Sequence, residues 1–232
     1  MTVPSHRPRP VIAIDGPAGA GKSTVALRLA QTLGFVLVDT GALYRGVALA
    51  AREAGLDWND PAALGALTSQ LRFEIQPAKD SDGAPRLFID GKDRSEDIRT
   101  PEISLGASEV SKHPRVRAGL LELQRQLGRE GGVVLEGRDI GTVVFPDAEL
   151  KVFLTAAPES RAERRVSDLA ARGIMAAFGQ TLDDIKLRDA RDASREVAPL
   201  RAAPDAVTLD TTHLGVDSVV AQLAELARRN GA

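Results

Sequence analysis

The sequence predicts an α/β fold: a five-stranded parallel sheet with helices on both faces, a small antiparallel insertion and a helical lid. Short apolar runs alternate along the chain with segments of helical periodicity, which is typical of a parallel sheet. The first run leads into a glycine-rich turn that precedes a helix. The runs expected to form buried strands are residues 11–14, 35–38, 133–135, 150–154 and 206–209. Ligands of such a sheet bind at the carboxyl ends of its strands.

The composition limits the class of protein. The chain has 232 residues, a formal net charge of −2 and no cysteine. This length suits one domain with excursions, or at most two, and allows a sizeable core. The charge gives no sign of a nucleic-acid or membrane partner, and the absence of cysteine excludes disulfides and cysteine-based zinc sites. We therefore expect a cytoplasmic protein without such partners, and we interpret residues 1–10 as a flexible tail.

The residues that follow the first strand fit the spacing G-x-x-x-x-G-K-[ST] of a phosphate-binding loop. They are Gly16, Pro17, Ala18, Gly19, Ala20, Gly21, Lys22, Ser23 and Thr24. Glycine lets the backbone curl around an anion, and the helix that follows brings the positive end of its dipole to the same place. Lys22 can reach the terminal phosphates of a nucleotide, and the Ser23 hydroxyl can bind Mg²⁺. The alternative is a tight turn with an incidental lysine.

The next elements follow from periodicity and capping residues. Residues 22–33 predict a helix that ends at Gly34, and residues 42–54 predict a second one. A cap followed by proline starts a third helix, which runs from residue 60 to about residue 71. The sequence pattern then changes to an alternation of apolar and polar residues, which predicts short strands. A loop at 79–83 and a hairpin turn at Asp90-Gly91 accompany them. We therefore expect a small antiparallel insertion at residues 72–99, with a plain surface hairpin as the alternative.

The second half of the chain continues the alternation. A helix that begins at Pro101 is broken before Pro114, where another helix starts. Three further helices are expected. The first spans residues 158–172, the second is capped by Thr181, and the last spans residues 217–228. We divide the chain into a core (residues 11–71, 100–157 and 196–232), the insertion at 72–99 and a lid at 158–195.

Both lid helices present arginines along one face. The first carries Arg161, Arg164 and Arg165, and the second carries Arg188, Arg191 and Arg195. Closure of two such helices over phosphates would neutralise charge and exclude water. The alternative is a solvated helix face with pairs such as Arg188 and Asp192.

Two further groups of polar residues follow predicted strands. In the first, Arg138 suits a phosphate or a base edge, and Glu136 or Asp139 suits the water shell of a metal or a sugar hydroxyl. The alternative there is an ion pair within Arg138-Asp139. In the second group, Tyr44 and Arg45 could clamp an acceptor, although Tyr44 could instead simply pack.

Four motifs together resemble bacterial cytidylate kinases. They are Gly16-Pro17-x-Gly19-x-Gly21-Lys22, Asp39-Thr40-Gly41-Ala42-x-Tyr44-Arg45, Gly137-Arg138-Asp139-x-Gly141-Thr142-Val143-Val144-Phe145-Pro146 and Arg188-Asp189-x-Arg191-Asp192. The resemblance implies a P-loop kinase fold and transfer of the γ-phosphoryl group of ATP to CMP or dCMP, with Mg²⁺. The residues that it implies for CMP binding are Thr40, Tyr44, Arg45, Ser108, Arg117, Arg138, Asp139, Arg188 and Asp192. It implies that Lys22, Arg161, Arg164 and Arg195 act on the transferred group.

The resemblance leaves some alternatives open. Thr40 stands where some members have serine, which keeps the hydroxyl, and Glu136 stands where some have aspartate. A kinase for UMP, AMP or a small metabolite would share the phosphate-binding loop. A non-catalytic nucleotide-binding switch would share it too, although a switch has little need to surround a second phosphate. We expect the protein to be a monomer.

Overall fold

The computed structural model describes residues 7–76, 78, 83–171 and 173–232. By their contacts the residues form two compact units, one of Met1–Phe35 with Gly131–Ala232 and one of Val36–Glu130. This division differs from the predicted core, insertion and lid, because the predicted insertion lies inside the second unit together with four helices. Residues 1–6 of the predicted tail and residues 79–82 of the predicted loop lie outside the described residues.

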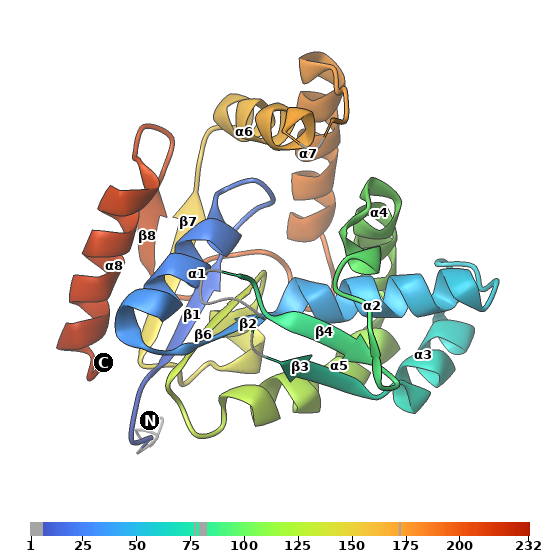
Figure 1. Ribbon diagram of the computed structural model, residues 1–232, viewed down its shortest axis with the longest axis horizontal. Coiled ribbons are helices and arrows are strands. Elements are labelled where there is room, and N and C mark those ends of the chain that lie inside the picture. Colours follow the sequence, from blue (N-terminus) through green and yellow to red (C-terminus); the bar gives the residue numbers. More distant parts are fainter. Residues whose placement is uncertain (1–6, 77, 79–82, 172) are drawn as a thin grey trace. The chain divides into compact units, whose positions relative to one another are not determined.

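Eight strands and eight α-helices are formed by the described residues (Figure 1). The strands are β1 (Val11–Asp15), β2 (Val36–Asp39), β3 (Phe73–Gln76), β4 (Arg86–Ile89), β5 (Lys92–Asp93), β6 (Val133–Gly137), β7 (Leu150–Thr155) and β8 (Val207–Asp210). The helices are α1 (Lys22–Leu33), α2 (Thr40–Glu53), α3 (Pro61–Gln70), α4 (Pro101–Val110), α5 (Pro114–Gly128), α6 (Pro158–Ala170), α7 (Phe178–Ala193) and α8 (Val216–Arg229). Two short turns, η1 (Asp97–Arg99) and η2 (Ile140–Val144), complete the list.

The five predicted core strands form one sheet in the order β2-β6-β1-β7-β8. Strand β1 pairs in parallel with β6 and β7, and β7 pairs in parallel with β8. All five residues of β1 are buried, and the first four are the apolar run that predicts a buried strand. Helices α1 and α8 contact each other in Figure 1. The predicted parallel sheet with helices is confirmed, and so is the small antiparallel sheet.

The antiparallel sheet consists of β3, β4 and β5. Asp90 and Gly91 join β4 to β5 with φ of 49° and 77°, as expected for a two-residue hairpin turn of this composition. The third strand of this sheet, β5, was not predicted from the sequence. Phe73, Leu87 and Ile89 of this sheet pack against a buried cluster from α2 to α5. The hairpin is therefore part of the core of its unit and not a plain surface hairpin.

Two local predictions are corrected by the structure. Thr181 is not a helix cap: α7 begins one turn earlier at Phe178, and the Thr181 hydroxyl donates to the Ala177 carbonyl oxygen at 2.9 Å. Residues 7–10 are not loose. Arg7 forms an ion pair with Asp147 at 2.6 Å, Arg9 donates to the carbonyl oxygens of the last turn of α1, and Pro10 is buried.

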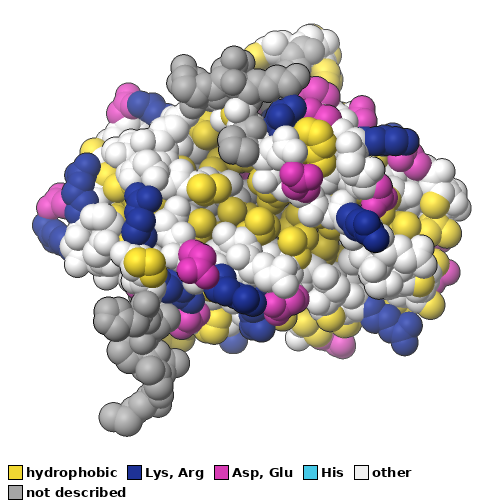
Figure 2. Space-filling model, turned by 60° about the horizontal axis from the view of Figure 1, so that its bottom comes forward, with side chains coloured by type: hydrophobic (Ala, Val, Ile, Leu, Met, Phe, Trp, Pro, Cys, Tyr) yellow, Lys and Arg dark blue, Asp and Glu magenta, His cyan; other side chains and the backbone are white. Residues whose placement is uncertain are grey.

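Charges of both signs are interspersed on the surface. Figure 2 shows Lys and Arg side chains next to Asp and Glu side chains on one face of the molecule. Arg28 pairs with Asp217 at 2.5 Å, and Arg52 pairs with Glu102 at 2.6 Å. Among the described residues, no helix is both long enough and apolar enough to cross a bilayer.

Candidate active site

The predicted phosphate-binding loop joins β1 to α1. Gly16 and Gly21 have φ of 149° and 85°, conformations that residues with a Cβ rarely adopt. A Cβ at Gly16 would also lie only 2.0 Å from the Leu154 carbonyl oxygen of β7. The loop therefore needs glycine for its conformation and for its packing. A backbone of this kind can turn successive N–H groups toward one anion.

Lys22 begins α1, and its side chain is 6% exposed. Its Nζ donates to the Pro17 carbonyl oxygen of the loop at 2.7 Å. Burial lowers the pKa of Lys22 to about 7, and the nearby charge of Arg138 acts in the same direction, whereas Glu136 raises it. A polyanion bound beside this ammonium group would restore its charge, because opposite charges favour the ionised form.

The side-chain oxygens of Ser23 and Glu136 lie together next to the loop. The Ser23 hydroxyl donates to Glu136 Oε2 at 2.9 Å, which joins the start of α1 to the end of β6. Hydroxyl and carboxylate oxygens are what Mg²⁺ prefers, directly or through water. No three His, Cys, Asp or Glu side chains among the described residues form a group that could hold a metal. The donor set therefore fits an ion that takes its remaining ligands from water and from the nucleotide phosphates.

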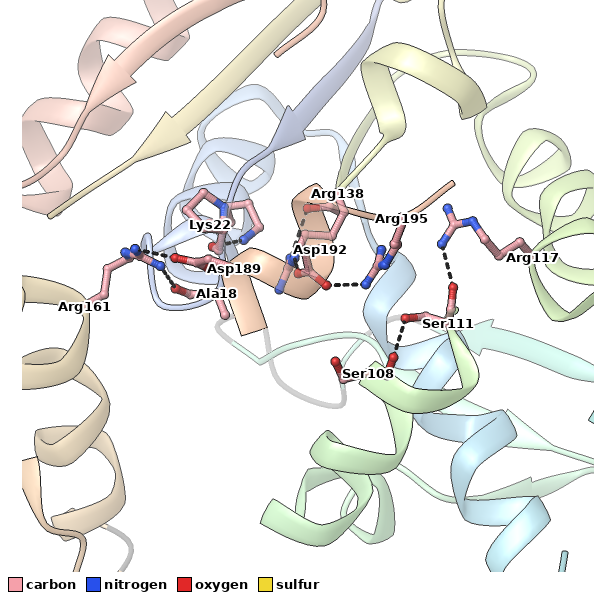
Figure 3. Close-up of polar contacts among 12 residues, drawn as sticks. Ala18, Lys22, Ser108, Ser111, Arg117, Arg138, Arg161, Asp189, Asp192 and Arg195 are labelled. Carbon is pink, nitrogen blue, oxygen red and sulfur yellow. Dashed lines mark hydrogen bonds and ion pairs between the residues drawn. The ribbon is translucent and has the colours of Figure 1, made fainter. Parts of the chain in front are cut away.

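Asp192 of α7 lies between two arginines, as Figure 3 shows. Arg138 Nε donates to Asp192 Oδ2 at 3.1 Å, and Arg195 pairs with the other carboxylate oxygen. Burial alone would raise the pKa of Asp192, but the positive charges of Arg138, Arg195 and Arg188 hold it below the usual value. The Asp192 side chain is 1% exposed, so it does not belong to a solvated helix face. The ion pair of Arg138 joins α7 to the end of β6.

Arg161 and Arg164 of α6 lie beside the loop. Arg161 is 3% exposed and donates to the Ala18 carbonyl oxygen at 3.1 Å and to Asp189 Oδ2 at 2.6 Å (Figure 3). Arg164 donates to the Thr211 carbonyl oxygen at 2.5 Å. These contacts hold both guanidinium groups beside oxygens of the protein, near the position predicted for phosphates.

The acceptor residues of the Val36–Glu130 unit begin at the end of β2. Asp39 caps α2 by accepting from the Ala42 N–H at 3.2 Å, and it pairs with Arg45 at 2.5 Å. Burial opposes ionisation of Asp39, but the Arg45 guanidinium lowers its pKa. Thr40, the first residue of α2, is 3% exposed. The structure thus brings Thr40 and Arg45 to the same end of one helix.

Tyr44, Arg117 and Ser108 form a second group in the same unit. The guanidinium carbon of Arg117 lies 5.5 Å from the centroid of the Tyr44 ring, a cation–π arrangement. Arg117 donates to the Ser111 carbonyl oxygen at 3.3 Å, and the Ser111 hydroxyl donates to the Ser108 carbonyl oxygen at 3.0 Å (Figure 3). Tyr44 is 9% exposed and belongs to the buried cluster of its unit. Tyr44 therefore packs in this cluster and also lies beside the Arg117 guanidinium group.

Sequence reasoning missed three residues that organise this region. Asp15 accepts hydrogen bonds from Ile140 and Gly141, Asp189 pairs with Arg161, and Thr211 accepts from Arg164. Asp189 lies inside the motif Arg188-Asp189-x-Arg191-Asp192, whereas the only sequence signal of the other two is proximity, since Asp15 precedes the loop and Thr211 follows β8.

Comparisons with known proteins give relatives over nearly the whole chain. The family model described as cytidylate kinase matches residues 12–229. A cytidylate kinase of Syntrophotalea carbinolica is 51% identical over 216 residues, which cover 93% of this chain and 91% of that protein. One from Exiguobacterium sibiricum is 50% identical and covers 93% of this chain and 96% of that protein.

A longer relative also matches this chain, and one solved structure is similar in fold. A bifunctional pantoate ligase/cytidylate kinase of Synechococcus elongatus is 48% identical over 96% of this chain, which is 43% of that protein. An uncharacterized protein from Eubacterium ventriosum has a similar fold, with a TM-score of 0.51 and 14% identity over 95% of this chain and 99% of its own. This chain belongs to the cytidylate kinase family.

Proposed function

We propose that this protein transfers the γ-phosphoryl group of ATP to CMP or dCMP and releases ADP and CDP or dCDP. The observation that carries the proposal is the family match over residues 12–229, which spans both the phosphate-binding loop and every proposed acceptor residue. Phosphoryl transfer between two phosphates needs positioning and charge neutralisation rather than a covalent nucleophile.

The donor is assigned to the loop from Gly16 to Thr24. Its main-chain N–H groups and the N-terminus of α1 bind the phosphates of ATP, and Lys22 adds a full positive charge. Ser23 and Glu136 hold Mg²⁺, which when bound supplies further neutralisation of the β- and γ-phosphates. The hydrogen bond between Ser23 and Glu136 supports this assignment, because it brings the two candidate ligands together.

The acceptor residues are supported by resemblance and by their local geometry. The residues that we assign to CMP binding are Thr40, Tyr44, Arg45, Ser108, Arg117, Arg138, Asp139, Arg188 and Asp192. The ion pair with Asp192 supports this assignment, because it holds the Arg138 guanidinium group in a defined position.

The transferred group is assigned to Arg161, Arg164 and Arg195. Arg161 and Arg164 donate to protein oxygens beside the loop, and we propose that they exchange some of these partners for phosphate oxygens. Residues 158–195 then act as the lid that excludes water from the reaction. Exclusion of water limits hydrolysis of ATP and strengthens the interactions between charges.

An acceptor panel tests the proposed function. ADP release is coupled to a colour reaction with ATP and, in turn, CMP, dCMP, UMP, AMP, a small non-nucleotide acceptor or no acceptor. We expect turnover with CMP and dCMP that exceeds the rate with the other acceptors by orders of magnitude. Faster turnover of another acceptor would show a different kinase. Binding of ATP without turnover of any acceptor would show a nucleotide-binding switch.

Three properties stay predictions. We expect a dependence on Mg²⁺, which titration of the metal checks. We expect a monomer, which light scattering behind a sizing column checks. We expect a cytoplasmic location, which fractionation of the source cells checks.

A further inference from the structure

Asp15, the last residue of β1, makes contacts that the proposed function does not use. Its side chain is 5% exposed. Oδ1 accepts a hydrogen bond from the N–H of Ile140, and Oδ2 accepts one from the N–H of Gly141, both at 2.8 Å. Each carboxylate oxygen therefore holds one of two consecutive backbone donors.

These two N–H groups begin the turn η2. The first N–H groups of a helical turn have no acceptor inside the turn itself. Within η2 the Asp139 carbonyl oxygen accepts from Val143 at 2.9 Å, and the Ile140 carbonyl oxygen accepts from Phe145 at 2.7 Å. The turn thus starts directly after Asp139, and the carboxylate of Asp15 supplies from another strand the acceptors that the first donors lack.

The two-residue segment Arg138-Asp139 is consequently flanked on both sides by residues that lie against Asp15. The parallel register of β1 and β6 places Asp15 opposite Gly137. The carboxylate of Asp15 holds Ile140 and Gly141. Only Arg138 and Asp139 lie between these two attachments, and Asp15 is followed directly by Gly16 of the phosphate-binding loop.

We infer that Asp15 is a positioning residue, which fixes Arg138 and Asp139 relative to the phosphate-binding loop. The inference rests on the proposed function, in which Arg138 and Asp139 bind CMP. Asp15 is thus a further residue that affects CMP binding, and it acts through Arg138 and Asp139. Asp15 thereby links the loop that binds the donor to a segment that binds the acceptor.

The chemistry of the contact requires a carboxylate. Asparagine has the same shape, but its NH₂ group would face one of the two N–H donors and leave it without an acceptor. Burial raises the pKa of Asp15 to about 6, whereas the hydrogen bonds from Gly141 and Ile140 lower it. At neutral pH the ionised form, which has two acceptor oxygens, predominates. Burial thus disfavours the negative charge of Asp15. The charged carboxylate is nevertheless the form that offers an acceptor oxygen to each of the two N–H groups.

The substitution Asp15→Asn tests the inference through the two substrates separately. We expect KM for CMP to rise about tenfold or more, because a small misplacement of binding groups has effects of this size. The dissociation constant of ATP should change less than threefold, because the loop keeps its residues. A loss of stability alone would leave both constants of the folded protein unchanged. Equal changes for ATP and CMP, or no change for CMP, would overturn the inference.

A matched control is Asp60→Asn. Asp60 also accepts from two consecutive backbone N–H groups, those of Ala62 and Ala63 at the start of α3, although both donate to Oδ1, and it lies outside the proposed site. We expect its KM for CMP to equal that of the wild type. If Asp15→Asn does not fold, Asp15→Ser, which keeps one acceptor oxygen, takes its place with the same expected difference between substrates.

Hydrogen exchange gives a readout that does not depend on activity. We expect the amides of Ile140 and Gly141 to exchange slowly in the wild type, and at least tenfold faster in the Asp15→Asn protein. Fast exchange of both amides in the wild type would overturn the inference. If the wild type did not phosphorylate CMP, the proposed function would fail, while the exchange rates would still decide whether Asp15 holds the turn.

Discussion

Replacement of Lys22 by methionine should stabilise the ligand-free protein while abolishing turnover. The fold buries this ammonium group with one backbone acceptor, the Pro17 carbonyl oxygen, and lowers its pKa from 10.5 to about 7. This change corresponds to about 5 kcal/mol of unfavourable free energy for the charged form. Loss of the hydrogen bond leaves the buried Pro17 carbonyl oxygen with only the long hydrogen bond from the Ala20 N–H at 3.5 Å, which costs about 1–3 kcal/mol. The expected net gain in the free energy of unfolding is therefore about 2–4 kcal/mol near neutral pH.

The same reasoning predicts a pH dependence with a definite sign. Between pH 7 and pH 10.5 the unfolded chain holds the Lys22 proton while the folded protein has released it. The free energy of unfolding should therefore rise with pH, by up to about 1.4 kcal/mol per pH unit from this group. Lys22→Met should remove this contribution, and the difference between the two proteins should shrink as the pH increases.

Urea unfolding at several pH values measures both effects. The matched control is Lys92→Met, because Lys92 is an exposed lysine of β5 and should change neither the stability nor its slope with pH. Turnover of CMP should fall by orders of magnitude in Lys22→Met and remain normal in the control. A Lys22→Met protein that is less stable than the wild type at neutral pH, with an unchanged slope, would refute the reasoning.

Three further substitutions test the assigned roles. Glu136→Gln weakens the partner of Ser23, so the Mg²⁺ concentration for half-maximal turnover should rise about tenfold, and an unchanged metal titration would speak against the assigned ligand pair. Arg188→Ala should raise the KM for CMP or lower kcat, and wild-type values of both would remove Arg188 from the acceptor site. Gly16→Ala places a Cβ 2.0 Å from the Leu154 carbonyl oxygen, so urea unfolding should show a loss of about 3 kcal/mol or more, whereas a wild-type midpoint would mean that the loop tolerates a side chain.

Local signals in the sequence were sufficient for most of the fold. The apolar runs predicted the strands of the parallel sheet, and Gly34 ends α1 with φ of 62°, as a left-handed cap should. The start of α7 was placed too late because a threonine can cap a helix or donate to the preceding turn inside it. Thr181 lies inside the helix because its hydroxyl donates to the Ala177 carbonyl oxygen, and the sequence does not show where that carbonyl oxygen lies.

The sequence predicts which residues belong to the candidate site, but it does not predict which of them form hydrogen bonds with one another. The loop from Gly16 to Thr24 is a contiguous motif, so its spacing is visible in the sequence. The pair of Ser23 and Glu136 is 113 residues apart, and Asp15 and Ile140 are 125 residues apart. Such contacts depend on the order and the register of the strands. The same apolar runs are compatible with many orders and registers, so the sequence does not show which side chains meet.

The fate of a label on the γ-phosphate of ATP tests the central claim most directly. The protein is mixed with CMP, Mg²⁺ and ATP that carries ³²P at the γ position, and the products are separated. We expect the label to appear in the β-phosphate of CDP, with little free phosphate, and we expect Lys22→Met to form almost none of this product. Release of the label only as inorganic phosphate, or its transfer to CMP at an unchanged rate by Lys22→Met, would contradict the account.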